Sequence, residues 1–171
     1  MEFVCKSADA TKALAKKISS KITGGQVLAL TGQLGAGKTT FVQGLAKGLK
    51  IKEKIQSPTF VLLKEYSIGK NHRRMKFCHI DLYRIEKIQD IEELGVEDFL
   101  GKKDVICVIE WAEKIKNVLE KISAKIIWIE FEYIGENERK LKVKTKNEKG
   151  KTTRQNLKLL TFKLRRDFHL T

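Results

Sequence analysis

The sequence predicts a single α/β domain with a mostly parallel central sheet, and three observations support this prediction. An apolar run at residues 27–31 is followed by a glycine-rich segment and then by apolar residues at helical spacing. Two further apolar runs, at residues 75–81 and 104–110, each end in an acidic residue. The 171 residues, 42% of them hydrophobic, contain no repeat, linker or low-complexity stretch. A chain of this length can bury one proper core, so we expect one domain over residues 1–171.

The first part of the chain predicts a helix, a buried strand and a second helix, in this order along the sequence. Ser7 is a candidate helix N-cap, and the apolar residues that follow it recur at helical spacing, at Ala10, Leu14, Ile18 and Ile22. The Thr-Gly-Gly sequence at residues 23–25 should end this helix. The run at 27–31 has the composition of a buried parallel strand. The second helix then has its apolar stripe at Val42, Leu45, Ala46 and Leu49.

The remainder of the chain predicts mainly strands. Pro58, the only proline, interrupts the pattern after the second helix. Beyond it we expect a hairpin with strands at 60–68 and 75–81 and a turn at 69–71. A short helix at 88–94 and three strands, at 104–110, 124–133 and 141–145, should follow. The last residues predict one more helix, because apolar side chains recur at Leu157, Leu160, Leu164 and Phe168.

Residues 32–39 read G-Q-L-G-A-G-K-T and fit the phosphate-binding P-loop pattern G-x-x-x-x-G-K-[ST]. The glycines let successive backbone N–H groups turn toward one anion, Lys38 can reach the outer phosphates, and Thr39 can ligate Mg²⁺. The next helix points its positive dipole end at the same anion. A glycine-rich turn that binds nothing is the alternative, which the strand before and the helix after disfavour. We therefore expect the three-layer fold of P-loop NTPases, with helices on both faces of the sheet and some antiparallel edge strands.

Two acidic residues at strand ends are candidates for the chemistry beside the phosphates. Glu110, in V-I-E-W, could hold Mg²⁺ directly or through water, as the second acid of a P-loop enzyme does. Asp81, in H-I-D-L-Y-R, would face the γ-phosphate if its strand is parallel and lies next to the P-loop strand. It could then position or deprotonate the attacking group. The structural alternatives are a charge that closes a strand for Glu110, and for Asp81 an ion pair with Arg84 or a cap on the next segment.

Further residues leave their roles open. Thr59 follows Pro58 in a loop of the kind that holds γ-phosphate-sensing threonines, although the sequence alone slightly favours a plain turn. Trp111 could pack in the core or offer a stacking face near a nucleotide. His79 is expected to be a packed strand residue. The sequence has no N-K-x-D guanine-reading motif, since the nearest string, T-K-N-E at 145–148, ends in Glu, so ATP is favoured over GTP.

The positive charge is concentrated near the C-terminus. The net charge is +14, and residues 139–171 contain twelve Lys or Arg and two acids, which leaves +4 for the first 138 residues. A basic segment suggests a polyanionic partner such as tRNA, although a lysine-rich composition explains it equally well. If the first reading holds, shortening the chain after Gly150 should weaken tRNA association at low salt and spare ATP binding.

The sequence also predicts a cytoplasmic location. It contains no apolar stretch of about 18 residues that could span a membrane, and the N-terminal residues lack the pattern of a signal peptide. Cys5, Cys78 and Cys107 lie far apart in apolar runs without a C-x-x-C pair, so neither a zinc site nor a disulfide framework is indicated. Such cysteine usage suits a reducing compartment.

Four strings in this order closely resemble the TsaE (YjeE) family: G-Q-L-G-A-G-K-T-T, S-P-T-F, H-I-D-L-Y-R and V-I-E-W. The intervening E-E-L-G-V-E-D-F is also similar to that family, and the resemblance covers roughly residues 7–145. It implies a small bacterial P-loop ATPase that works with the TsaB and TsaD proteins to form N6-threonylcarbamoyladenosine beside the tRNA anticodon. In such a system a separate enzyme makes threonylcarbamoyl-AMP, TsaD performs the transfer, and ATP hydrolysis resets the complex.

The resemblance also implies a set of site residues. Thr39 and Glu110 would serve Mg²⁺, and Lys38, Asp81 and Glu110 would be catalytic. The residues implied to contact ATP are Gly35, Ala36, Gly37, Lys38, Thr39, Thr40, Thr59, Asp81, Thr11 and Arg139. The chain departs from the family at Gln33, where an acid is frequent.

The leading hypothesis is therefore a Mg²⁺-dependent ATPase subunit of the tRNA threonylcarbamoylation machinery. One alternative is a small-molecule or nucleotide kinase that uses Asp81 as a base; phosphate transfer without partner proteins would favour it. Another is a basic RNA-binding module whose P-loop is only structural. Undetectable ATP binding together with tight, salt-sensitive tRNA binding would support that reading.

Overall fold

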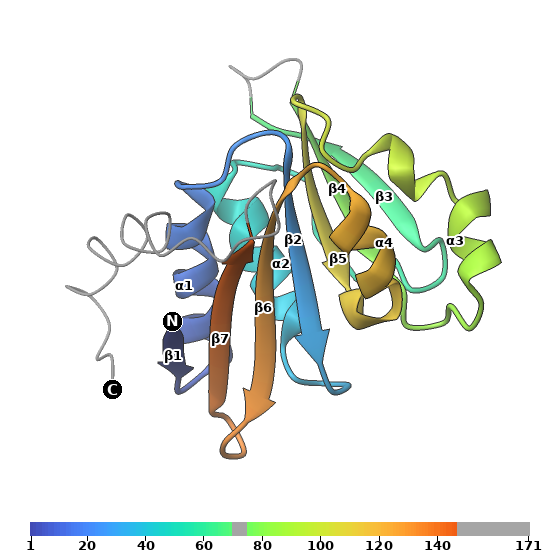
Figure 1. Ribbon diagram of the computed structural model, residues 1–171. Coiled ribbons are helices and arrows are strands. Elements are labelled where there is room, and N and C mark those ends of the chain that lie inside the picture. Colours follow the sequence, from blue (N-terminus) through green and yellow to red (C-terminus); the bar gives the residue numbers. More distant parts are fainter. Residues whose placement is uncertain (70–74, 147–171) are drawn as a thin grey trace.

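The structure is a computed structural model that describes residues 1–69 and 75–146. Seven strands form one sheet in the order β1-β7-β6-β2-β5-β4-β3, with helices on both sides (Figure 1). The elements in chain order are β1 (Glu2–Cys5), α1 (Ala8–Ser19), β2 (Gln26–Gly32), α2 (Lys38–Gly48), β3 (Leu63–Ser67), β4 (Lys76–Asp81), α3 (Ile88–Glu93), η1 (Val96–Asp98), β5 (Val105–Glu110), η2 (Ala112–Ile115), α4 (Lys116–Lys121), β6 (Lys125–Tyr133) and β7 (Arg139–Lys146).

The centre of the sheet is parallel and its edges are antiparallel. Strands β4, β5, β2 and β6 run in the same direction, whereas β3, β7 and β1 pair antiparallel with their neighbours. The register places Leu30 opposite Glu110 and Glu110 opposite Asp81. The carboxyl ends of β2, β5 and β4 therefore meet at one edge of the sheet. This arrangement confirms the predicted α/β class and its antiparallel edges.

Two apolar clusters fill the space on the two faces of the sheet. On one face, α1 and α2 pack against the strands with fully buried side chains such as Leu14 and Phe41. On the other face, α3, η2 and α4 supply Ile91, Ile115 and Leu119. Burial of each apolar face is the main force that holds such layers together.

Helix α1 begins as predicted and ends earlier than predicted. The Ser7 hydroxyl accepts a hydrogen bond from the Ala10 N–H at 3.0 Å, which satisfies one of the free donors of the first turn. The helix stops at Ser19, not at Ile22. Ile22 nevertheless joins the core, because a turn in which the Lys21 N–H donates to the Ile18 carbonyl oxygen carries the chain back toward the sheet.

Several other elements differ from the sequence prediction. Strand β1 pairs with β7 although its four residues are too few to show a period, and the short helix α4 was not expected either. The first strand of the hairpin begins at Leu63, not at residue 60, because a turn follows Pro58 and Leu62 has a left-handed φ of 61°. Most of the predicted turn at 69–71 and the predicted C-terminal helix lie outside the described residues.

The described part of the chain contains no helix that is both long enough and apolar enough to cross a membrane. Cys5, Cys78 and Cys107 are all free and buried. Burial raises the pKa of the Cys5 thiol, although a hydrogen bond with Thr11 opposes the shift.

Candidate nucleotide-binding site

A cavity of roughly 360 Å³ lies at the edge of the sheet where the parallel strands end. Its wall brings together the P-loop, the loop before β3, and the ends of β4 and β5, which are far apart in the sequence. The lining residues are Leu34, Gly35, Ala36, Gly37, Lys38, Thr39, Thr40, Ser57, Thr59, Asp81, Tyr83, Glu110 and Trp111. Nine residues of the predicted site therefore line one cavity.

The backbone of the P-loop has the conformation that an anion nest requires. Gly35 and Gly37 have φ angles of 73° and 96°, which side-chain-bearing residues rarely adopt. Helix α2 begins at Lys38 directly after Gly37, and the Phe41 N–H donates to the Gly37 carbonyl oxygen at 2.9 Å. The first N–H groups of α2 thus face the cavity without helical partners of their own, which is the arrangement that binds phosphate.

Lys38 is buried, with 4% of its surface exposed, at the base of the P-loop. Its ammonium group donates to the carbonyl oxygens of Gly32 at 2.7 Å and Gln33 at 2.9 Å. Burial lowers the pKa of Lys38, and the carboxylates of Glu110, Glu113 and Asp81 oppose this shift without cancelling it. A buried cation whose hydrogen bonds go to two carbonyl oxygens is suited to receive an incoming anion.

Thr39 and Glu110 are in direct contact across the cavity. The Thr39 hydroxyl donates to Oε2 of Glu110 at 2.9 Å, and the other carboxylate oxygen, Oε1, lies 2.9 Å from Nε2 of His79. Both Glu110 and His79 are buried. Thr39 and Glu110, the two residues expected to serve Mg²⁺, are thus hydrogen-bonded to each other. His79 is packed as expected but also bonds to the Glu110 carboxylate.

Asp81 is the centre of a hydrogen-bonded group at the cavity wall. Its Oδ2 accepts from the hydroxyl of Ser57 and, at 2.6 Å, from that of Thr59. Its Oδ1 accepts from the Tyr83 N–H at 2.9 Å, so Asp81 also caps the segment after β4. The alternative of an ion pair with Arg84 is not realised, because the Arg84 guanidinium lies over the Phe60 ring at 4.3 Å.

One condition that we set for Asp81 is corrected by the strand order. The condition is that the Asp81 strand is parallel and next to the P-loop strand; it is parallel, but β5 lies between β2 and β4. Glu110, at the end of β5, therefore lies on a strand next to the P-loop strand, and Asp81 lies one strand farther away. Asp81 still lines the cavity, because the side chains of Asp81 and Glu110 stand opposite each other in the parallel register.

Trp111 forms part of the cavity wall in a strained backbone conformation. Its φ of 61° is unusual for a residue with a side chain, and such strain is found at functional sites. The Lys38 ammonium lies 3.8 Å from the centre of its ring, and the Tyr83 ring lies 5.2 Å away on an adjoining part of the wall. Trp111 thus lines the cavity and also packs, partly buried, against the apolar cluster on the α4 side of the sheet, so both placements left open by the sequence apply.

The structure does not bring Thr11 into this cavity. Thr11 is buried in α1, and its hydroxyl donates to the Ser7 carbonyl oxygen at 3.2 Å. Arg139 does not line the cavity either, but its guanidinium lies 4.1 Å from the Tyr133 ring, and the Tyr133 hydroxyl donates to the Leu34 carbonyl oxygen in the P-loop. Nucleotide contacts by Thr11 and Arg139 remain predictions.

Three residues of the site were not singled out for it from the sequence. The Ser57 hydroxyl, like that of Thr59, donates to the Asp81 carboxylate. The Tyr83 N–H donates to the same carboxylate, and the Tyr83 side chain lines the cavity. His79 is hydrogen-bonded to Glu110. A usable signal existed for His79, because residues two apart on a strand share a face and Asp81 was already a candidate. Ser57 and Tyr83 carry no periodic signal, since both lie in loops.

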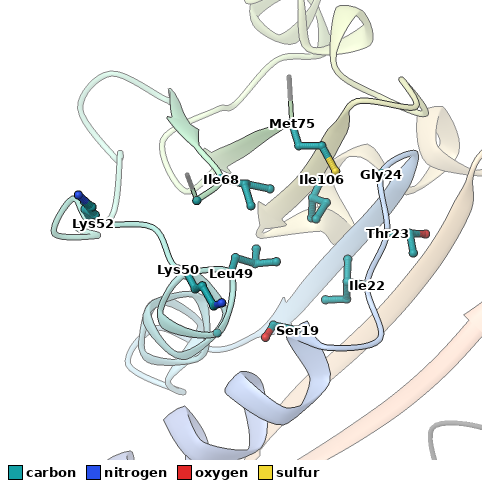
Figure 2. A pocket seen from close by; sticks show the side chains of 12 residues that line it. Ser19, Ile22, Thr23, Gly24, Leu49, Lys50, Lys52, Ile68, Met75 and Ile106 are labelled. Carbon is teal, nitrogen blue, oxygen red and sulfur yellow. The ribbon is translucent and has the colours of Figure 1, made fainter. Parts of the chain in front are cut away.

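A larger cavity, of roughly 600 Å³, lies at the opposite edge of the sheet, beyond the last residues of α1 and α2. Figure 2 shows Ile22, Leu49, Ile68, Met75 and Ile106 around this space. No residue of the predicted site lines it. The helix ends that border it are C-terminal ends with negative partial charge, which disfavour phosphate.

The donor set at the first cavity fits Mg²⁺. Thr39, Glu110 and Asp81 present hydroxyl and carboxylate oxygens, which are the ligands that this ion prefers, and the first two are in contact. Over residues 1–69 and 75–146, no group of three or more His, Cys, Asp or Glu residues could form an all-protein metal site. Mg²⁺ needs no such cage, since it is commonly held by one or two protein groups together with phosphates.

Comparisons with known proteins agree with this geometry. A family model described as "Threonylcarbamoyl adenosine biosynthesis protein TsaE" matches residues 5–141. The tRNA threonylcarbamoyladenosine biosynthesis protein TsaE of Bacillus subtilis (strain 168) is 38% identical over 131 residues, which are 77% of this chain and 77% of the relative. The protein of the same name from Aquifex aeolicus (strain VF5) is 38% identical over 144 residues, which are 83% of this chain and 94% of the relative.

A solved structure extends the similarity to three dimensions. The crystal structure of Bacillus subtilis YdiB superposes with a TM-score of 0.70 and 28% sequence identity, and the match covers 97% of this chain and 94% of that one. The matched segment of the family model includes the P-loop, Asp81 and Glu110, which are the groups that meet at the cavity. The chain therefore belongs to the TsaE family of tRNA threonylcarbamoyladenosine biosynthesis proteins.

Proposed function

We propose that this chain is a Mg²⁺-dependent ATPase subunit of the cytoplasmic machinery that forms threonylcarbamoyladenosine in tRNA, and that it acts with TsaB- and TsaD-like proteins. The observation that carries the proposal is the meeting of the P-loop with Asp81 and Glu110 in one cavity. A nest that only held phosphate would need neither acid. Family membership supplies the pathway, and the absence of a guanine-reading motif favours ATP.

In this proposal the P-loop N–H groups and Lys38 hold the β- and γ-phosphates. Lys38 exchanges its bonds to the carbonyl oxygens of Gly32 and Gln33 for phosphate oxygens, which is favourable because a buried ammonium gains a full negative charge. Thr39 and Glu110 provide the protein oxygens for Mg²⁺. The bound ion neutralises the charge that develops on the transferred phosphoryl group.

Asp81 orients the attacking water for in-line displacement. Its carboxylate already binds the hydroxyls of Ser57 and Thr59, so the loop that carries them responds to whatever Asp81 binds. Loops of this kind in P-loop proteins report whether a γ-phosphate is present. In this proposal, the loop that carries Ser57 and Thr59 changes conformation on ATP hydrolysis, and a partner protein bound to the loop detects the change.

The exposed apolar side chains support a protein partner at this same edge. The exposed large hydrophobic residues of the described part of the chain line the cavity, contact a residue that lines it, or lie within two positions of such a residue in the chain: Leu34, Phe60, Val61, Tyr83, Tyr133 and Ile134. We call this set the apolar rim. Apolar side chains gathered around a polar site mark an interaction surface. A partner that covers the apolar rim would contact the Thr59 loop and sense the nucleotide.

The direct test is multiple-turnover tRNA modification by the reconstituted complex. Lys38→Ala and Asp81→Asn should each lower ATP hydrolysis and repeated tRNA modification by about 100-fold or more, because one removes the phosphate-binding cation and the other the water-orienting carboxylate. Lys47→Ala is the matched control, since Lys47 is an exposed lysine of the same helix. Unchanged turnover in both site variants would refute the proposal, and partner-independent phosphate transfer to a small acceptor would favour a kinase.

A further inference from the structure

His79 does not line the candidate site but contacts one of its residues, Glu110. It is two residues before Asp81 on β4, so both side chains lie on the α2 face of the sheet. Its side chain is fully buried and does not line the cavity. Its Nε2 atom lies 2.9 Å from Oε1 of Glu110, and this is its contact with the residues of the site.

The two oxygens of the Glu110 carboxylate have different partners. Oε1 faces His79 and Oε2 faces the hydroxyl of Thr39, each at 2.9 Å. An ionised carboxylate only accepts hydrogen bonds, so the hydrogen of the first contact is on Nε2 of His79. Two donors on opposite sides fix the plane of the carboxylate and direct Oε2 toward Thr39.

The other imidazole nitrogen of His79, Nδ1, shows that a histidine at this buried position has an energetic cost. In the described part of the chain, Nδ1 of His79 is buried and has no hydrogen-bond partner. Leaving a polar atom unsatisfied in a core costs free energy, about 1–3 kcal/mol in typical cases. The neighbours of His79 on the same face, Phe77 and Val108, are apolar and carry no such cost. The hydrogen bond to Glu110 is therefore the contribution that an apolar side chain at this position would lack.

We infer that His79 is a positioning residue, which holds the Glu110 carboxylate in the orientation that presents Oε2 to Thr39 and to the metal position. The inference rests on the proposed function, because it assigns His79 a role in Mg²⁺-dependent nucleotide binding. Without the Nε2 donor, Oε1 would be buried without a partner and the carboxylate would be free to turn. Loss of such supporting hydrogen bonds lowers metal affinity about 10–100-fold in other sites.

The test compares variants that keep or remove a donor at the Nε2 position. In His79→Gln the amide nitrogen takes the place of Nε2, whereas in His79→Asn it takes the place of Nδ1, so only the first can reach Glu110. Phe77→Leu is the packing control, because it changes volume on the same face of the same strand without contacting Glu110. The readouts are Mn²⁺ binding in the presence of a non-hydrolysable ATP analogue, followed by electron paramagnetic resonance, and ATP-analogue affinity in EDTA.

We expect His79→Asn to weaken nucleotide-dependent Mn²⁺ binding about 10–100-fold, while His79→Gln and Phe77→Leu stay near the unaltered chain. Affinity in EDTA should be the same for all four proteins, since Lys38 and the P-loop are intact. Equal Mn²⁺ affinity in the Asn and Gln variants, or an equal loss in Phe77→Leu, would overturn the inference. If the unaltered chain did not bind the analogue at all, the proposed function would be overturned instead. The experiment therefore distinguishes failure of the His79 inference from failure of the proposed function.

Discussion

At the scale of single residues, burial of Lys38 should make the stability of the chain and the affinity of the site depend on pH above neutral. Its folded-state pKa lies below the ordinary lysine value of 10.5 because burial disfavours the charged form. Below the folded-state pKa, the buried ammonium therefore opposes folding. As the pH rises through the lowered pKa toward 10.5, the folded chain loses this proton before the unfolded chain does, and the contribution of Lys38 to the free energy of unfolding increases.

The same titration should weaken nucleotide binding. We expect ATP affinity to fall as the pH is raised from neutral toward 10.5, because a neutral amine attracts phosphate less than an ammonium does. Calorimetric titration with ATP across this pH range measures the effect. Lys38→Arg is the matched control, since a guanidinium stays charged throughout the range, and its weaker binding should not follow the same fall. A flat profile for the unaltered chain would contradict the assignment.

At the scale of elements, the close packing of α1 on α2 depends on a glycine in the middle of a helix. Gly44 is buried in α2, and a methyl group placed there would press on the Lys12 carbonyl oxygen and lie 2.8 Å from the Cβ of Ala15. Helix propensity alone favours alanine over glycine by about 1 kcal/mol. The two effects have opposite signs, so one substitution decides which is larger.

We expect Gly44→Ala to lower the free energy of unfolding by about 1–3 kcal/mol, because α1 must move away from α2 and its packing is lost. Urea denaturation measures the change. Lys47→Ala, an exposed change on the same helix, should stay within about 0.5 kcal/mol of the unaltered chain. A gain in stability for Gly44→Ala would show that propensity outweighs the contact.

At the scale of the whole molecule, the apolar rim and the nucleotide cavity occupy the same edge of the sheet. Phe60 is 81% exposed, so its replacement removes surface and little core packing. We expect Phe60→Ser to weaken binding to the TsaB–TsaD pair about 10-fold or more, as loss of an aromatic anchor does at interfaces, while ATP affinity is unchanged. Fluorescence titration with the partner pair measures this.

The control for this prediction is a polar substitution at the other edge of the sheet. Lys121→Ser removes an exposed side chain at the end of α4, just before β6 begins, and should leave partner binding intact. Equal affinities for the Phe60 and Lys121 variants would place the partner surface elsewhere.

Features that depend on local spacing could be predicted from the amino-acid sequence alone. The P-loop could be predicted because Gly35, Gly37, Lys38 and Thr39 must lie at fixed distances along one strand–turn–helix segment. The Ser7 cap and the two acids at strand ends were predictable for the same reason, since each depends on its immediate neighbours.

Which of these groups contact one another depends on the three-dimensional arrangement of the strands. That Glu110 contacts Thr39, that Ser57 shares Asp81 with Thr59, and that His79 holds Glu110 all depend on the order and register of the strands. The sequence left open whether the Asp81 strand lies next to β2, and in the sheet β5 lies between them. Strand order results from burial of the apolar faces of the whole sheet, which involves residues far apart in the chain. Local sequence patterns do not specify contacts between distant residues, so the partners of Asp81, Glu110 and Thr39 could not be predicted from them.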